Sequence, residues 1–255
     1  MTTDRTTRMG AIELDGGDAI ECYQAMPDGP PRGGILVIHE IWGLQDQTRT
    51  IADRLADEGY AVFAPDVLSR IGVDPVAGAD LERLRFHATD EERTREQPRL
   101  RELFSAAYAP DYTAWSVGAL QRALDALAAV AGVGDRLAVV GFCFGGGLAF
   151  QLAAADPRVL AAVPFYGRGP DRRTLARIHA PVLAFYGADD EPLMADLPRL
   201  TAEAEAEGVD FDPVVYPGAK HAFFNDLNPI VYDRDAAEDA GTRMHVFIER
   251  AFATD

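Results

Sequence analysis

The segment RLAVVGFCFGGGL at residues 136–148 limits the fold of this chain more than any other feature. A run of buried-strand character leads into glycine-x-Cys143-x-glycine, and small residues of helical character follow. The two glycines permit a tight turn and let neighbouring backbone come close. The spacing therefore predicts a nucleophile on a strained strand-to-helix turn, where the helix N–H groups and dipole stabilise a thiolate and a nearby oxyanion.

Apolar runs alternate with amphipathic stretches along the whole chain, a pattern typical of a mostly parallel sheet covered by helices. Together with the strand–cysteine–helix turn, this order predicts an α/β-hydrolase fold, with a mostly parallel central sheet flanked by helices. The sequence contains no internal repeat or linker, so we expect a single domain over residues 1–255. The expected strands cover 19–25, 34–39, 61–65, 136–141, 159–166, 181–187 and 210–216, and the expected helices 45–58, 112–130, 193–207 and 236–253.

Residues 68–110 interrupt the alternation with a long, charged excursion between a predicted strand and a predicted helix. Excursions of this length are often lids or binding loops, so this one is a candidate for either role, and the sequence leaves its role open. Aromatic residues in and beside it either line a pocket or pack the excursion onto the body of the domain. They are Phe86, Phe104, Tyr108, Tyr112 and Trp115.

Composition restricts the partners and the compartment. The net charge of −17 argues against nucleic acid and anionic membranes, and no apolar run approaches the about 20 residues of a membrane span. A disulfide between the only two cysteines, Cys22 and Cys143, would disable the nucleophile, so we expect free thiols in a cytoplasmic protein. No metal-ligand spacing, phosphate loop or dinucleotide fingerprint occurs, so we expect neither metal nor cofactor. A monomer and a small homo-oligomer both remain open.

A cysteine nucleophile needs a base to accept its proton and an acid to orient that base. Among the five histidines, only His221 lies in a loop after the last predicted strand, where this fold carries the base. The acid is expected after the preceding strand, in ADDEP at 188–192. The Gly-x-x-Asp spacing favours Asp190, and Asp189 is the alternative.

An oxyanion hole requires two backbone N–H donors. Phe144, directly after the nucleophile, supplies one by its position on the turn. The second is expected from the turn that follows the buried strand at 34–39, where Ile41 stands in HEIWGL.

With these residues placed, the chain resembles the dienelactone hydrolase (carboxymethylenebutenolidase) family. The similar segments follow the family's order: HEIWGL at 39–44, GYAVFAPD at 59–66, GFCFGG at 141–146, FYG at 165–167, YGADD at 186–190 and GAKHAFFND at 218–226. By this resemblance Cys143, Asp190 and His221 form a catalytic triad. Glu40 is then the family's additional carboxylate, which holds the resting thiol neutral until a substrate displaces it.

The chain departs from the family where the substrate binds. Family members that act on dienelactone hold the substrate carboxylate with arginines, one of them shortly after the catalytic histidine, and Asn225 occupies that position here. Arg95 is a loose match to the other arginine, and Trp42 and Phe223 complete the candidate substrate-binding residues. The reaction class therefore carries over more firmly than the substrate.

The expected activity is hydrolysis of a small-molecule lactone or activated carboxylic ester through a thioester on Cys143. Because a thiolate is itself a good leaving group, enol lactones and activated esters are favoured over amides. Class I glutamine amidotransferases also use a cysteine elbow, but they carry a carboxylate two residues after the histidine, where this chain has Phe223. The non-enzymatic alternative is a redox-sensing or ligand-binding protein that keeps the hydrolase fold.

Overall fold

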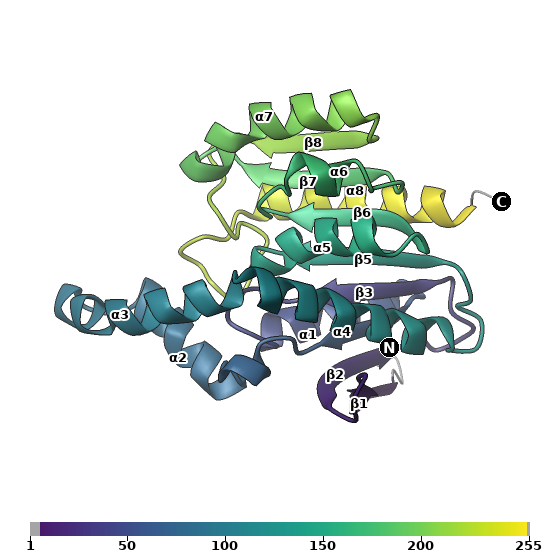
Figure 1. The fold of residues 1–255 in the computed structure, drawn as a ribbon, viewed down its shortest axis with the longest axis horizontal. Coiled ribbons are helices and arrows are strands. Elements are labelled where there is room, and N and C mark those ends of the chain that lie inside the picture. Colours follow the sequence, from purple (N-terminus) through teal and green to yellow (C-terminus); the bar gives the residue numbers. More distant parts are fainter. Residues whose placement is uncertain (1–5, 254–255) are drawn as a thin grey trace.

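A computed structural model describes residues 6–253, and an eight-stranded sheet runs through its centre (Figure 1). The strand order is β1-β2-β4-β3-β5-β6-β7-β8, with β2 antiparallel to both β1 and β4 and the other pairs parallel. This is the α/β-hydrolase architecture predicted from the sequence. The strands are β1 (Thr6–Glu13), β2 (Ala19–Met26), β3 (Gly34–Ile38), β4 (Ala61–Pro65), β5 (Leu137–Phe142), β6 (Val159–Phe165), β7 (Val182–Gly187) and β8 (Phe211–Tyr216).

Helices cover both faces of the sheet, as Figure 1 shows. The packed apolar clusters place α4, α5, α6 and α7 on one face and α1 and α8 on the other. None of the described helices is long and apolar enough to cross a membrane. The helices are α1 (Asp46–Asp57), α2 (Pro75–Phe86), α3 (Asp90–Ala107), α4 (Pro110–Ala128), α5 (Phe144–Ala155), α6 (Arg172–Leu175), α7 (Glu191–Glu207) and α8 (Arg234–Ala253), with a short 3-10 turn η1 (Ser69–Ile71).

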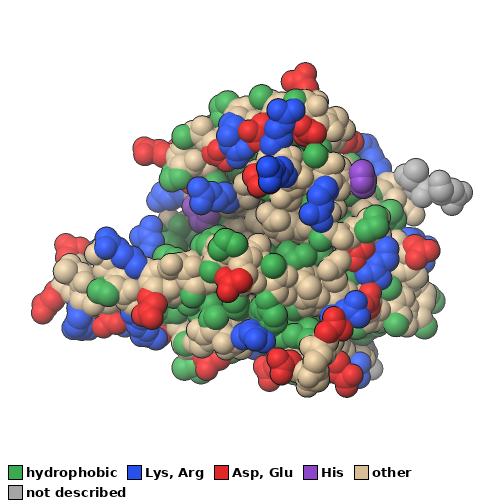
Figure 2. Space-filling view, in the orientation of Figure 1, with side chains coloured by type: hydrophobic (Ala, Val, Ile, Leu, Met, Phe, Trp, Pro, Cys, Tyr) green, Lys and Arg blue, Asp and Glu red, His purple; other side chains and the backbone are tan. Residues whose placement is uncertain are grey.

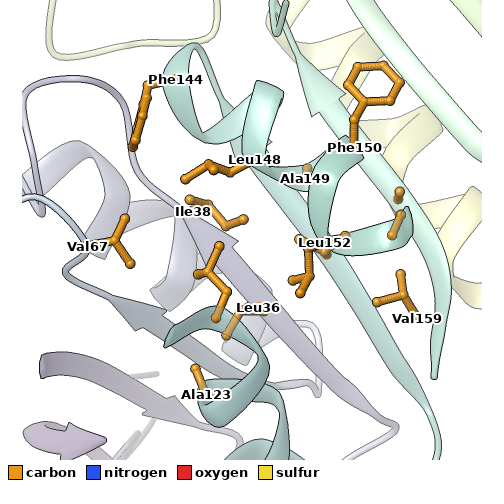
Figure 3. Packing of buried hydrophobic residues seen from close by; sticks show 14 of the residues in the cluster. Leu36, Ile38, Val67, Ala123, Phe144, Leu148, Ala149, Phe150, Leu152 and Val159 are labelled. Atoms are coloured by element: carbon orange, nitrogen blue, oxygen red, sulfur yellow. The ribbon is translucent and has the colours of Figure 1, made fainter. Parts of the chain in front are cut away.

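The central strands are apolar because both of their faces are covered. Every residue of β3, β4, β5 and β7 is buried, as expected for parallel strands between two helical layers. Figure 3 shows Leu36 and Ile38 of β3 beside Leu148 and Leu152 of α5. The helix that begins directly after Cys143 is therefore anchored in the core, which holds the turn before it in place.

The excursion at 68–110 is largely helical, which the sequence analysis did not anticipate. It forms η1, α2 and α3, and α3 extends away from the sheet (Figure 1). The space-filling view shows acidic and basic side chains along this arm (Figure 2). Two capping signals were present in the sequence: the Asp74 side chain accepts the first free N–H groups of α2, and Thr89 with Glu92 forms a capping box at the start of α3.

Strand β1 was also missed. It is the edge of the sheet, and all but one of its eight residues are at least partly exposed, so it lacks the apolar alternation that predicts a strand. It pairs with β2 over its whole length, from Thr6 opposite Met26 to Glu13 opposite Ala19.

Candidate active site

Cys143 lies on the turn between β5 and α5 with a backbone that residues other than glycine seldom adopt (φ 54°, ψ −111°). A Cβ atom at Gly141 would lie 2.0 Å from the Gly145 carbonyl oxygen, and one at Gly145 would lie 2.3 Å from the Ile38 oxygen. Both glycines are therefore required for the turn to close against α5 and β3. The half-buried thiol emerges at the carboxyl ends of the strands, as the sequence spacing indicated.

His221 connects Cys143 with an acid. Its Nδ1 lies 2.5 Å from Asp190 Oδ2, and its side chain also hydrogen-bonds with Cys143. Burial alone would lower the pKa of His221, but the charge of the cysteine and the hydrogen bond to Asp190 outweigh it and raise the pKa well above its ordinary value. Asp189, the alternative acid, is exposed. Its backbone N–H donates a hydrogen bond to the Ala219 carbonyl oxygen. The structure thus brings Asp190 and not Asp189 to the imidazole.

Glu40 lies at the end of β3 and is only 4% exposed. Its Oε1 accepts a hydrogen bond of 3.0 Å from the Tyr166 hydroxyl, and its Oε2 accepts one of 3.5 Å from the Asn225 amide. Burial raises the pKa of Glu40 to about 7, against the opposing effects of the His221 charge and of these two hydrogen bonds. Glu40 therefore gains and loses its proton near neutral pH.

Tyr166 was not singled out from the sequence, where it is only the centre of the FYG segment. It is fully buried at the end of β6, and its ring centre lies 5.1 Å from that of His221. Cys143, Tyr166 and Ala222 are the residues other than glycine with positive φ between residues 6 and 253, and all belong to this site. Backbone strain is thus concentrated around the candidate triad, as is common at functional sites.

His39 is a second residue that the sequence analysis left without a role. Its Nε2 accepts the Val67 N–H at 3.2 Å, so Nδ1 carries the proton that it donates to the Glu40 carbonyl oxygen at 2.7 Å. Complete burial lowers the pKa of His39 and keeps the ring neutral. The ring links the backbone of Glu40 to that of Val67, just after β4. It therefore positions the Glu40 carboxylate from outside the group formed by Cys143, His221 and Asp190.

The two expected oxyanion donors flank the turn. Phe144 is the first residue of α5, and Ile41 follows Glu40 in a turn closed by a 3.1 Å hydrogen bond from Gly43 N–H to the Glu40 carbonyl. Neither Ile41 N–H nor Phe144 N–H donates to any group in the part of the chain that the structure describes. Both are therefore free to donate to a ligand.

Two of the four candidate substrate-binding residues line a pocket that meets the candidate site at Glu40, although Cys143, Asp190 and His221 are not among its lining residues. Trp42 and Asn225 line this pocket of about 290 Å³ together with Glu40. Phe223 is fully buried, and its ring centre lies 5.5 Å from that of Tyr166 and 5.3 Å from that of Tyr216. It therefore anchors the loop that carries His221 in the core. Arg95 is exposed on α3, and its guanidinium pairs with a neighbouring glutamate at 3.1 Å.

The aromatic residues of the excursion mainly pack it onto the domain. Phe86 and Phe104 each lie 6.3 Å from the Trp42 ring, and Tyr108 lies edge-on to Phe144 at 5.5 Å. These aromatic contacts therefore connect the excursion to the turn after β3 and to the first residue of α5.

With the geometry in place, comparison with known proteins gives a family. The sequence profile of the dienelactone hydrolase family matches residues 20–252. The chain belongs to this family. It is 33% identical over 248 residues to a protein of Saccharolobus solfataricus named as a carboxymethylenebutenolidase, covering 92% of this chain and 95% of the relative. A similarly named protein of Methylorubrum extorquens is 34% identical over 242 residues, covering 88% of this chain and 75% of the relative.

The structural similarity to the family covers nearly all of the chain. A crystal structure named as a dienelactone hydrolase from Klebsiella pneumoniae superposes with a TM-score of 0.80 at 27% identity, covering 96% of this chain and 98% of that one. The resemblance inferred from short segments is therefore confirmed at the level of the family and of the fold.

Proposed function

We propose that the chain hydrolyses a lactone or a small activated carboxylic ester through a thioester on Cys143, with Cys143, His221 and Asp190 as its triad. Membership of the dienelactone hydrolase family supports an ester or lactone hydrolase. The single observation that carries the triad is the contact of His221 with Asp190 on one side and with Cys143 on the other.

In the first step His221 accepts the thiol proton, and the sulfur attacks the carbonyl carbon of the substrate. The carbonyl oxygen becomes an oxyanion that receives hydrogen bonds from the free N–H groups of Ile41 and Phe144. The ester C–O bond then breaks, and His221 returns its proton to the leaving oxygen. The product of this half-reaction is a thioester between Cys143 and the acyl group.

In the second step His221 accepts a proton from water, and the hydroxide attacks the thioester carbon. The C–S bond breaks, the sulfur takes the proton back, and the carboxylic acid leaves. Asp190 stabilises the imidazolium in both steps and fixes the tautomer of the ring. The His221 side chain is 43% exposed, so substrate and water both have access to it.

Glu40 contributes a second proton-holding group beside the thiol. A carboxyl group with a pKa of about 7 exists in both protonation states at neutral pH. The role of this residue in the family is to keep the resting sulfur neutral, and the buried Glu40 next to the triad loop is suited to it.

Hydrolysis of cis- and trans-dienelactone and of p-nitrophenyl acetate by the wild type and by Cys143→Ala tests the proposal. We expect turnover that the substitution abolishes, together with an acyl group on Cys143 that mass spectrometry detects after rapid acid quenching. Cys22→Ala is the matched control, because Cys22 is fully buried and burial raises the pKa of its thiol to about 12. Hydrolysis that survives Cys143→Ala would refute the thioester.

A further inference from the structure

Two carboxylates, each paired with an asparagine, line the pocket that meets the candidate site at Glu40. The cavity of about 290 Å³ lies between the turn after β3, helix α2 and the loop after β8, and its size suits part of a small ligand. The first of these segments contributes Glu40, the second Glu82, and the third Asn225 and Asn228. The mechanism above uses only one of these four side chains.

Each carboxylate is held by an asparagine. Asn225 Nδ2 donates to Glu40 at 3.5 Å, and Asn228 Nδ2 donates to Glu82 at 3.4 Å. Both asparagines are only 4% exposed. The oxygen of each amide accepts the backbone N–H two residues further on, which directs the nitrogen towards its carboxylate. The pocket therefore has a fixed polar wall.

Helix α2 is held firmly against the turn that carries Glu40. Gln45 Nε2 donates to the carbonyl oxygens of Trp42 and Pro75, both at 2.8 Å. A Cβ atom at Gly78 would lie only 1.8 Å from the Trp42 oxygen, so the helix backbone packs directly on the turn. Glu82, one turn further along α2, is thereby fixed relative to Glu40.

Acidic side chains outnumber basic ones around the pocket: Glu40, Asp46 and Glu82 line it together with Arg83 and His87. The charge of Glu82 contributes to the raised pKa of Glu40, after the larger effect of burial, and the positive group that opposes it is His221. The Arg83 guanidinium pairs with Asp80 at 3.2 Å. A carboxylate entering the pocket would meet like charges.

A neutral polar group would instead find hydrogen-bonding partners. The carboxylate oxygens of Glu40 and Glu82 accept hydrogen bonds from a hydroxyl or an amide.

We propose that the pocket between Glu40 and Glu82 binds an uncharged hydrogen-bonding group of the substrate, and that Glu82 is a specificity-determining residue that disfavours substrates carrying a carboxylate. This inference rests on the proposed function, because the pocket shares Glu40 with the candidate active site. Asn225 stands where family members that act on dienelactone have an arginine, so the basic side chains that line the pocket are Arg83, which pairs with Asp80, and His87.

The test compares two substrates that differ in charge and little in size: cis-dienelactone, which has a free carboxylate, and its primary carboxamide. We expect wild type to have the higher kcat/KM for the carboxamide. Glu82→Gln should raise kcat/KM for the carboxylate by about fivefold and leave that for the carboxamide within about twofold, with the difference shrinking at high salt. Glu205→Gln, the same change at an exposed position on α7, should leave the ratio unchanged.

A second measurement needs no turnover. Iodoacetate carries a carboxylate where iodoacetamide has an uncharged amide, so the two reagents differ in charge as the two substrates do. The ratio of the iodoacetate rate to the iodoacetamide rate of alkylation at Cys143 should rise several-fold in Glu82→Gln. Wild-type preference for the carboxylate, or an unchanged alkylation ratio, would overturn the inference even if hydrolysis depends on Cys143. Hydrolysis that persists in Cys143→Ala would instead overturn the proposed function, and the alkylation ratio would then decide the pocket alone.

Discussion

Replacing Glu40 by glutamine should stabilise the protein by an amount that depends on pH. Burial raises the pKa of Glu40 from its ordinary 4.5 to about 7. Below pH 4.5 the group is protonated in the folded and unfolded chain, and its full stabilising contribution is present. Between pH 4.5 and 7 only the unfolded chain releases the proton, so the wild type loses stability as the pH rises. Above pH 7 the loss is complete and constant.

The size of the effect follows from the same two pKa values. Each pKa unit corresponds to about 1.4 kcal/mol, so ionised Glu40 lowers the free energy of unfolding by about 3 kcal/mol above pH 7. The Glu40→Gln variant has no proton to lose and keeps an oxygen for the Tyr166 hydroxyl. The free energy of unfolding of the variant should therefore exceed that of the wild type by an amount that grows by about 2 kcal/mol between pH 5.5 and 7 and then stays level.

Urea unfolding followed by circular dichroism at pH 5.5, 6.25, 7 and 8 measures this difference. Glu205→Gln serves as the control, because the exposed Glu205 side chain should give a difference from the wild type that does not change with pH. The reasoning fails if the gap between wild type and Glu40→Gln is the same at every pH, since the buried carboxyl would then ionise at its ordinary pKa.

Two further outcomes follow from the geometry of the site. Asp190→Asn should lower kcat for p-nitrophenyl acetate by about 100-fold or more, because the imidazole loses the acid that fixes its tautomer, and should lower the pKa of His221 in an NMR titration. An unchanged pKa would contradict the assigned contact. Gly141→Ala should prevent correct folding or strongly lower the melting temperature, because its Cβ would collide with the Gly145 carbonyl. Gly118→Ala, in the open middle of α4, should raise the melting temperature slightly, and equal effects of the two alanines would refute the packing argument.

The parts of the structure with local signals were predictable from the sequence. Buried parallel strands have continuous apolar runs, so β3 and β5 were found, and with β5 the position of Cys143, whereas Glu40 was indicated only by the family resemblance. The order of nucleophile, acid and base along the chain then indicated Asp190 and His221, which the structure brings together.

What the sequence did not disclose depends on contacts between distant segments. Tyr166 reaches Glu40 only because β6 lies beside β5 and the residue that follows β6 has a left-handed backbone. Phe223 lies within the His221 loop, but nothing in its neighbours shows that it points into the core. The pairing of Glu82 with Asn228, which are 146 positions apart, has no local signature.

The candidate triad and one wall of the pocket come from different segments, and this separation affects how the substrate range of the protein can change. The loops after β5, β7 and β8 carry Cys143, Asp190 and His221, whereas one wall of the pocket belongs to α2, within a single contiguous excursion. Changes in α2 should therefore alter which molecules the pocket accepts and leave the proposed triad in place. A directed-evolution library restricted to the pocket-facing positions of α2 (Ala79, Glu82 and Arg83) would explore substrate range with little risk to the chemistry.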